Sequence, residues 1–155
     1  MHPHYYLFWV CVAAYSIHLL EEFAFDWRGW ANKTMGLAAG SPLFYFVSAT
    51  VMILGFCCAM ISAWLPVISL MFPALLIINA IFFHLLPAII QRHFSPGLFS
   101  AILLLLPSGV LTYYGIALDG GMPAWVILAS GFGAAVFAGF VLLLAKTEAR
   151  FRYKA

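Results

Sequence analysis

The chain has 155 residues, of which 66% are hydrophobic and only 8% are charged. Because soluble domains usually carry about 25% charged residues, this composition excludes an ordinary water-soluble domain and indicates an integral membrane protein. The formal net charge is only +2. The three cysteines all lie in apolar runs, so they predict small buried side chains and no disulfide framework.

Five apolar segments are each long enough to cross a bilayer, which takes about 20 helical residues. We expect the first apolar segment to be retained as a membrane helix, because no basic stretch precedes it and no signal-peptide cleavage site follows it. A polar loop, residues 26–40, follows this segment. The sequence therefore predicts one all-α domain over residues 1–155, a bundle of five transmembrane helices. The expected spans are about 5–25, 42–64, 67–90, 96–118 and 124–145.

The positive charges indicate the orientation of this bundle. With five spans, every lysine and arginine falls on the same side of the membrane, and the other side carries only Asp119. The positive-inside rule then places the N-terminus outside and the C-terminus in the cytoplasm, and we expect the membrane to be a bacterial inner (plasma) membrane. The basic residues are Arg28, Lys33, Arg92, Lys146, Arg150, Arg152 and Lys154.

The basic tail, residues 146–155, alternates cations with Phe151 and Tyr153. This pattern favours an anchor on anionic membrane lipid over nucleic-acid binding. No nucleic-acid partner is expected.

Three ionisable side chains interrupt the first span, in the order His18-Leu19-Leu20-Glu21-Glu22. Residues three and four apart share a face of a helix, so both glutamates lie near the ridge of His18. Neighbouring carboxylates in hydrocarbon repel each other unless a metal ion, a proton or a cationic partner compensates them. We therefore expect a functional site in this turn.

The third span supplies a second intramembrane histidine, His84, and an amide, Asn79. In the expected topology His18 and His84 each lie about two turns from the inner end of their helices, so both should lie at the same depth, in the inner leaflet. Asn79 and His84 are five residues apart and can face one site only if the helix is distorted. Pro87 offers a cause, because it cannot donate a hydrogen bond to the carbonyl of Phe83.

These residues predict a metal site formed by His18 and His84 with Glu21, Glu22 or both. Two imidazoles and a carboxylate with an open position match a catalytic zinc or a non-haem iron centre, and we favour zinc. A glutamate that does not bind the metal could serve as general base, and Tyr15 or Asn79 could orient substrate. The competing interpretation is a hydrogen-bonded cluster that only joins two helices.

The last span carries small residues every four positions, Gly131, Ala135 and Gly139, beside Ser130, Ala134 and Ala138. Such spacing permits close helix packing in membranes. It predicts either packing within the chain or a homodimer face, with equal weight. His93 is expected at the membrane interface, His4 in solvent and Asp119 in a turn.

The chain resembles the HXXEE family of small integral membrane proteins. The resemblance rests on His18-Leu19-Leu20-Glu21-Glu22, on Asn79 followed by His84, and on Ser95-Pro96-Gly97 before a long apolar run. It covers roughly residues 5–118. The resemblance implies that His18, Glu21, Glu22, Asn79 and His84 form one site, and it implies no reaction.

The function expected first is that of a metal-dependent enzyme, most simply a hydrolase acting on an amphipathic or lipid-like substrate. The first alternative is a metal-free isomerase or cyclase in which the glutamate pair shares a proton. The second is a small proton-coupled transporter. Five spans with no internal repeat argue against a transporter built from inverted halves.

Overall fold

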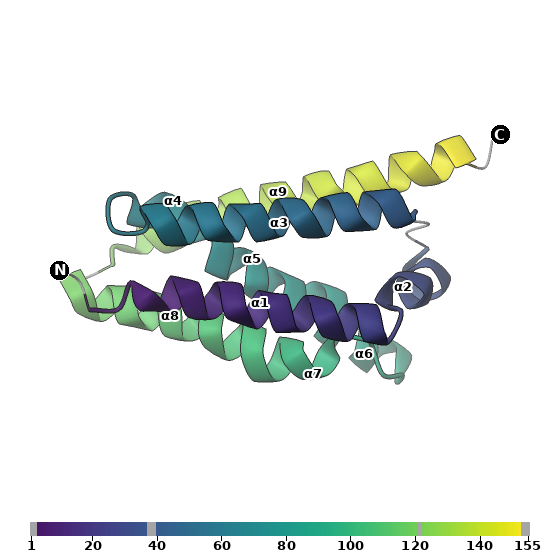
Figure 1. Cartoon of the computed structure of the whole chain (residues 1–155), viewed down its shortest axis with the longest axis horizontal. Coiled ribbons are helices and arrows are strands. Elements are labelled where there is room, and N and C mark those ends of the chain that lie inside the picture. Colours follow the sequence, from purple (N-terminus) through teal and green to yellow (C-terminus); the bar gives the residue numbers. More distant parts are fainter. Residues whose placement is uncertain (1–2, 37–39, 121, 153–155) are drawn as a thin grey trace.

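The computed structural model describes residues 3–36, 40–120 and 122–152. The chain is 86% helical with no strand in these ranges, and five of its helical segments are long and apolar enough to cross a membrane. The predicted all-α bundle is therefore confirmed. The segments run side by side along the long axis of the molecule (Figure 1).

The first span is α1 (Tyr6–Ala24) and the second is α3 (Ser41–Ile61), close to the expected boundaries. The polar loop between them contains a further helix, α2 (Trp27–Met35). Asp26 starts this helix with a left-handed backbone (φ 50°), and its side chain accepts a hydrogen bond from the amide of Gly29. This is an ordinary aspartate N-cap, and it turns the chain back over one end of the bundle.

Prolines divide the third span, Pro66–Gln91, and the fourth, Leu98–Gly120. In the π-helical segments η1 and η2 the hydrogen bonds reach back five residues, and each segment ends two residues before a proline, Pro87 and Pro107 respectively. A proline removes the normal bond to the residue four positions earlier, so the distortion predicted near Pro87 is present. The elements are α4 (Pro66–Ser69), α5 (Met71–Asn79), η1 (Ala80–Leu85), α6 (Leu86–Gln91), α7 (Leu98–Ser100), η2 (Ala101–Leu105) and α8 (Leu106–Gly120).

The fifth span is α9 (Ala124–Arg152), which continues as helix into the expected tail. Ser130, Ala134 and Ala138 are buried, whereas a Cβ atom added at Gly131 or Gly139 would meet nothing within 4 Å. The stripe that includes these two glycines therefore faces away from the rest of the chain. The homodimer through this face stays a prediction.

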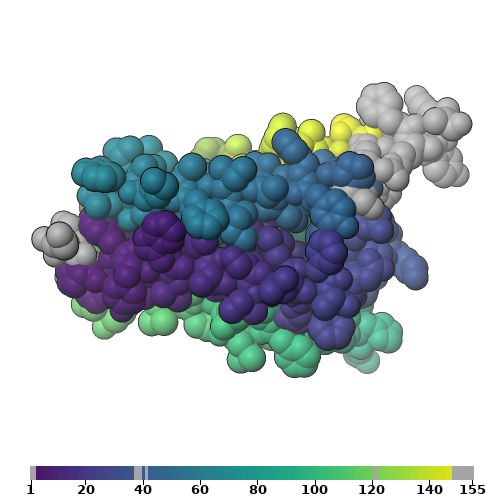
Figure 2. Space-filling model, in the orientation of Figure 1, coloured from purple at the N-terminus to yellow at the C-terminus, as the bar shows by residue number. Residues whose placement is uncertain are grey.

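Helix α5 is the centre of the packing: it contacts α8 and α9 most extensively and also α1 and α3. Helix α1 packs between α3 and α8, and α1 and α3 cover the face seen in Figure 2. Fully buried side chains such as Phe8, Phe72, Leu76 and Leu105 fill the interior.

The two ends of the bundle differ in charge. One end carries α2, α6, the start of α3 and the C-terminus, and therefore Arg28, Lys33, Arg92 and Lys146; we call it the basic end (Figure 1). At the other end, Asp119 pairs with the ring and the amide of His4, which ties the N-terminal segment to α8. The expectations of a solvated His4 and of a simple turn role for Asp119 are therefore wrong.

Candidate metal centre

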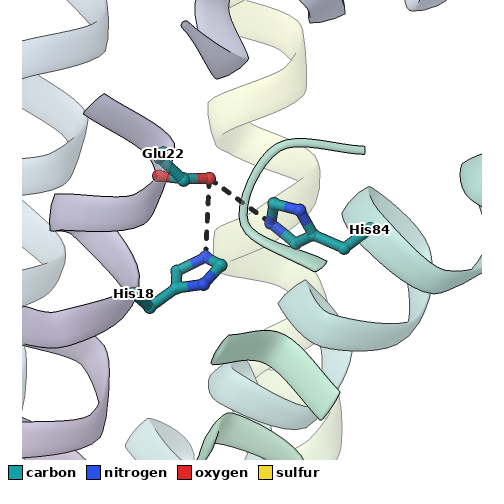
Figure 3. Close-up of side chains that lie close together, drawn as sticks. All are labelled: His18, Glu22 and His84. Atoms are coloured by element: carbon teal, nitrogen blue, oxygen red, sulfur yellow. Dashed lines mark ion pairs between the residues drawn. The ribbon is translucent and has the colours of Figure 1, made fainter. Parts of the chain in front are cut away.

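Three buried side chains meet inside the bundle near its basic end. His18 and Glu22 come from the same face of α1, and His84 comes from η1 in the third span. One oxygen of Glu22, Oε1, lies 3.5 Å from Nε2 of His18 and 3.3 Å from Nε2 of His84 (Figure 3). Both imidazoles have no exposed surface, and Glu22 is 6% exposed.

The π-helical turn explains how His84 reaches this position. A π-helical turn is wider than an α-helical turn and brings residues that are five apart, such as Asn79 and His84, closer to the same face of the helix. His84 therefore meets the residues of α1, and Asn79 lines the cavity beside them. The rings of His18 and His84 lie edge to face, with centroids 4.7 Å apart. The expected common depth of the two histidines is therefore observed.

Partners from the fourth span determine which ring nitrogens carry hydrogen. Nδ1 of His84 lies 2.9 Å from the carbonyl oxygen of Pro96, which can only accept, so this nitrogen donates. Nδ1 of His18 lies 2.9 Å from Oγ of Ser100, and that hydroxyl can donate to the carbonyl of Gly97 at 3.3 Å. With both Nδ1 atoms as donors, a neutral ring presents the lone pair of Nε2 to Glu22.

With these tautomers, two imidazole lone pairs and a carboxylate face one another in a buried space. No described residue supplies a hydrogen-bond partner to Nε2 of His18 or of His84. Three such acceptors are compatible only if a cation or additional protons lie between them.

The spacing of the three groups fits a metal ion. One ligand atom from each residue can be chosen so that all three lie within 4.8 Å of one another. Ligand atoms about 2.1 Å from a tetrahedral zinc ion are about 3.4 Å apart, close to the observed 3.3 and 3.5 Å. Charge-assisted hydrogen bonds are shorter, about 2.7–2.9 Å. The outward Nδ1 bonds are also the arrangement usual for metal-binding histidines.

A glycine at the start of the fourth span makes the close approach possible. Gly97 has φ +85°, and a Cβ atom there would lie 2.7 Å from Cε1 of His84 and 2.9 Å from Cε1 of His18. Any larger residue would collide with both rings and would also strain the backbone. The family resemblance draws attention to Ser95-Pro96-Gly97, but the close approach of the Gly97 backbone to both rings is visible only in three dimensions.

Glu21 is not part of this group of three. Its carboxylate accepts hydrogen bonds from the backbone amides of Phe99, at 3.2 Å, and Ser100, at 2.7 Å. These amides open the fourth span, where a carboxylate is stabilised by the helix N-terminus. The structure therefore separates the two predicted glutamates: Glu22 meets the histidines, and Glu21 holds the fourth span to α1. His93 is exposed and lies apart from the cluster.

A partly open cavity of about 110 Å³, which we call the lateral cavity, begins at Glu22. Tyr15, Trp27 and Asn79 contribute to its lining, and its remaining walls are almost entirely apolar. The predicted residues Tyr15 and Asn79 are thus brought beside Glu22. Trp27, whose ring also lies 6.0 Å from that of His84, falls within the polar loop expected at residues 26–40 and was not predicted to reach the site; the aspartate N-cap at Asp26 is the signal that could have indicated its helix.

Fold and site together define a five-span membrane protein with a buried His/Glu/His cluster. A family described as "Protein of unknown function with HXXEE motif" matches residues 9–112, and the chain belongs to this family. The motif that gives the family its description is the turn of α1 from His18 to Glu22. No curated protein and no solved structure matches the chain.

Proposed function

We propose that this protein is a metal-dependent membrane enzyme, a hydrolase that acts on an amphipathic or lipid-like substrate. The observation that carries the proposal is the convergence of two Nε2 atoms, neither with a hydrogen-bond partner among the described residues, on one carboxylate oxygen in a buried space. His18, Glu22 and His84 would hold the metal, with zinc favoured over iron. A bound zinc ion supplies a water whose pKa is lowered to about 7, a nucleophile available at neutral pH.

The side chains around the cluster have roles that fit this chemistry. Ser100 and the Pro96 carbonyl hold the two imidazoles in the tautomer that binds a cation. Glu22 would serve as the carboxylate ligand, and Tyr15 and Asn79 line the same cavity and can orient the substrate. In the reaction the water oxygen bonds to the acyl carbon, the bond from that carbon to the leaving group breaks, and the leaving group takes up a proton.

The same ligand set also occurs in non-haem iron sites. The metal-free alternative needs the two glutamates to share a proton, but Glu21 and Glu22 have separate partners. The metal content of the purified protein distinguishes the zinc enzyme from both alternatives, the iron enzyme and the metal-free enzyme.

The test is elemental analysis of the protein purified without chelators in mild detergent. We expect about one zinc ion per chain in the wild type and almost none in His18→Ala, His84→Ala or Glu22→Gln. The matched control is His93→Ala, which changes an exposed histidine outside the cluster and should keep its metal. Circular dichroism and gel filtration check that each variant is folded. A folded wild type without metal would overturn the proposal, and iron in place of zinc would redirect it to oxidation.

A further inference from the structure

The lateral cavity continues from Glu22 between two helices that leave room for a ligand. Helices α3 and α9 both contribute to the walls, and each packs most extensively on another helix: α3 on α1, and α9 on α5. The walls are aliphatic and aromatic, for example Val47 and Val51 on α3 and Phe137 and Leu142 on α9. The apolar walls of this partly open space suit part of a hydrocarbon chain.

The end of the cavity next to the metal centre has a different chemistry. Two of its residues carry buried polar atoms that no described residue satisfies, Nε1 of Trp27 and Oδ1 of Asn79. A buried polar group without a partner is costly, so such groups in a cavity indicate a missing ligand. The indole N–H can only donate, and the amide oxygen can only accept.

The ligand that satisfies both atoms must therefore accept one hydrogen bond and donate another. Among the residues that the structure describes, the cavity lining contains the carboxylate of Glu22 and no lysine, arginine or histidine, which favours a neutral head group over an anionic one. An acyl amide offers a carbonyl oxygen and an N–H within a few ångströms, whereas a simple ester offers acceptors only.

We propose that the lateral cavity binds a single-chain fatty acyl amide, with its chain between α3 and α9 and its amide group on Trp27 and Asn79. The inference rests on the proposed function, because the bound amide is then the substrate of the metal centre. The carbonyl of the amide accepts from the Trp27 indole, and the amide N–H donates to the Asn79 side chain. Its hydrolysis breaks the C–N bond, adds the water oxygen to the acyl carbon and releases a fatty acid and a protonated amine.

The experiment measures binding and not turnover. Wild-type protein in lipid nanodiscs is irradiated with a 12-carbon acyl amide that carries a diazirine on its chain, and the labelled peptides are identified by mass spectrometry. We expect labels in Ser41–Ile61 and Ala124–Arg152. The unlabelled amide should compete at least about tenfold better than the ethyl ester of equal chain length.

Two variants test the head-group contacts while keeping the shape of the site. Trp27→Phe removes the N–H but keeps an aromatic ring, and Asn79→Leu removes the amide; each should weaken amide binding about fivefold to tenfold. The matched control is Trp30→Phe, in the same helix but outside the cavity lining. Equal binding by Trp27→Phe and wild type, or equal competition by ester and amide, would overturn the assignment.

A third variant tests the position of the chain. Ala138→Phe fills the cavity wall on α9 and should abolish labelling, whereas Ala135→Phe on the exposed side of the same helix should not. Labels that persist in Ala138→Phe would place the ligand elsewhere and overturn the inference. Metal content is measured on the same samples. Amide binding without metal would refute the metal-dependent enzyme but not the amide-binding site. Metal without amide binding would refute the amide-binding site but not the metal centre.

Discussion

Two adjacent glutamates in α1 have different tasks because of the geometry of the helix. Successive residues are rotated by about 100°, so Glu22 reaches the histidines while Glu21 reaches the amides of Phe99 and Ser100. One residue therefore belongs to the candidate centre, and its neighbour fastens the span that supplies the partners of that centre.

This division predicts opposite results for the two positions. Glu21→Ala should lower the stability of the protein by about 1 kcal/mol, because it removes a carboxylate from a helix N-terminus, but it should leave the metal content unchanged. Thermal unfolding in detergent and elemental analysis of the same sample check this, with Glu22→Gln as the variant that loses metal. Loss of metal in a folded Glu21→Ala would assign Glu21 to the centre after all.

The hydroxyl of Ser100 is predicted to tune metal affinity without touching the ion. Ser100→Ala removes the partner of Nδ1 in His18, and such losses typically weaken metal binding by about 10–100-fold. A chelator competition titration measures the change. Ser108→Ala is the control, because this buried serine lies about two turns further along the same span and its hydroxyl donates to the carbonyl of Leu105; an equal loss in both variants would indicate a general packing effect.

Gly97 gives a test of the close packing around the two imidazoles. Gly97→Ala should cost more than the strain of a left-handed alanine, about 1–2 kcal/mol, because its methyl group meets both rings. Gly36→Ala is matched to it: Gly36 also has a positive φ (+62°), but a Cβ atom there would meet no atom of the described residues within 4 Å. We expect only Gly97→Ala to lose metal, measured beside the melting temperature of each variant. Equal behaviour of the two would show that the rings do not depend on the glycine.

At the scale of secondary-structure elements, the π-helical segment η1 determines where His84 points. Pro87→Ala should restore the ordinary hydrogen bond to the Phe83 carbonyl, narrow the turn and rotate His84 away from Glu22. The expected result is a folded protein with strongly reduced metal content, checked by circular dichroism and elemental analysis. Pro42→Ala, in the exposed first turn of α3, is the control and should be neutral. Full metal content in Pro87→Ala would disprove the role of the distortion.

The spans and the distortion near Pro87 could be predicted from sequence because hydrophobic length and a missing N–H are local properties. The approach of His18 to His84 followed from counting turns in a fixed topology. The position of α2 could not be predicted in this way, since it depends on how Trp27 packs against Phe44 and His84. The separate partners of Glu21 and Glu22 depend equally on where the fourth span begins in space.

At the scale of the whole molecule, the described cations gather at the basic end, and this predicts that the basic end faces the cytoplasm. A fluorescent protein fused after residue 155 should fluoresce in a bacterial host, and alkaline phosphatase fused there should be inactive. The same reporters fused after Asp119, on a chain truncated at that point, should give the opposite pattern. Reversal of both patterns would place the candidate centre in the outer leaflet.

The candidate centre is formed by segments of the chain that the ribosome synthesises at different times. Its three side chains lie in the first and third spans, but both Nδ1 partners, Pro96 and Ser100, lie at the start of the fourth. A nascent chain that ends before the fourth span thus holds all three side chains of the candidate centre, but neither partner that orients the rings. Insertion of the fourth span is therefore the step during biogenesis at which the orientation of both imidazoles becomes fixed.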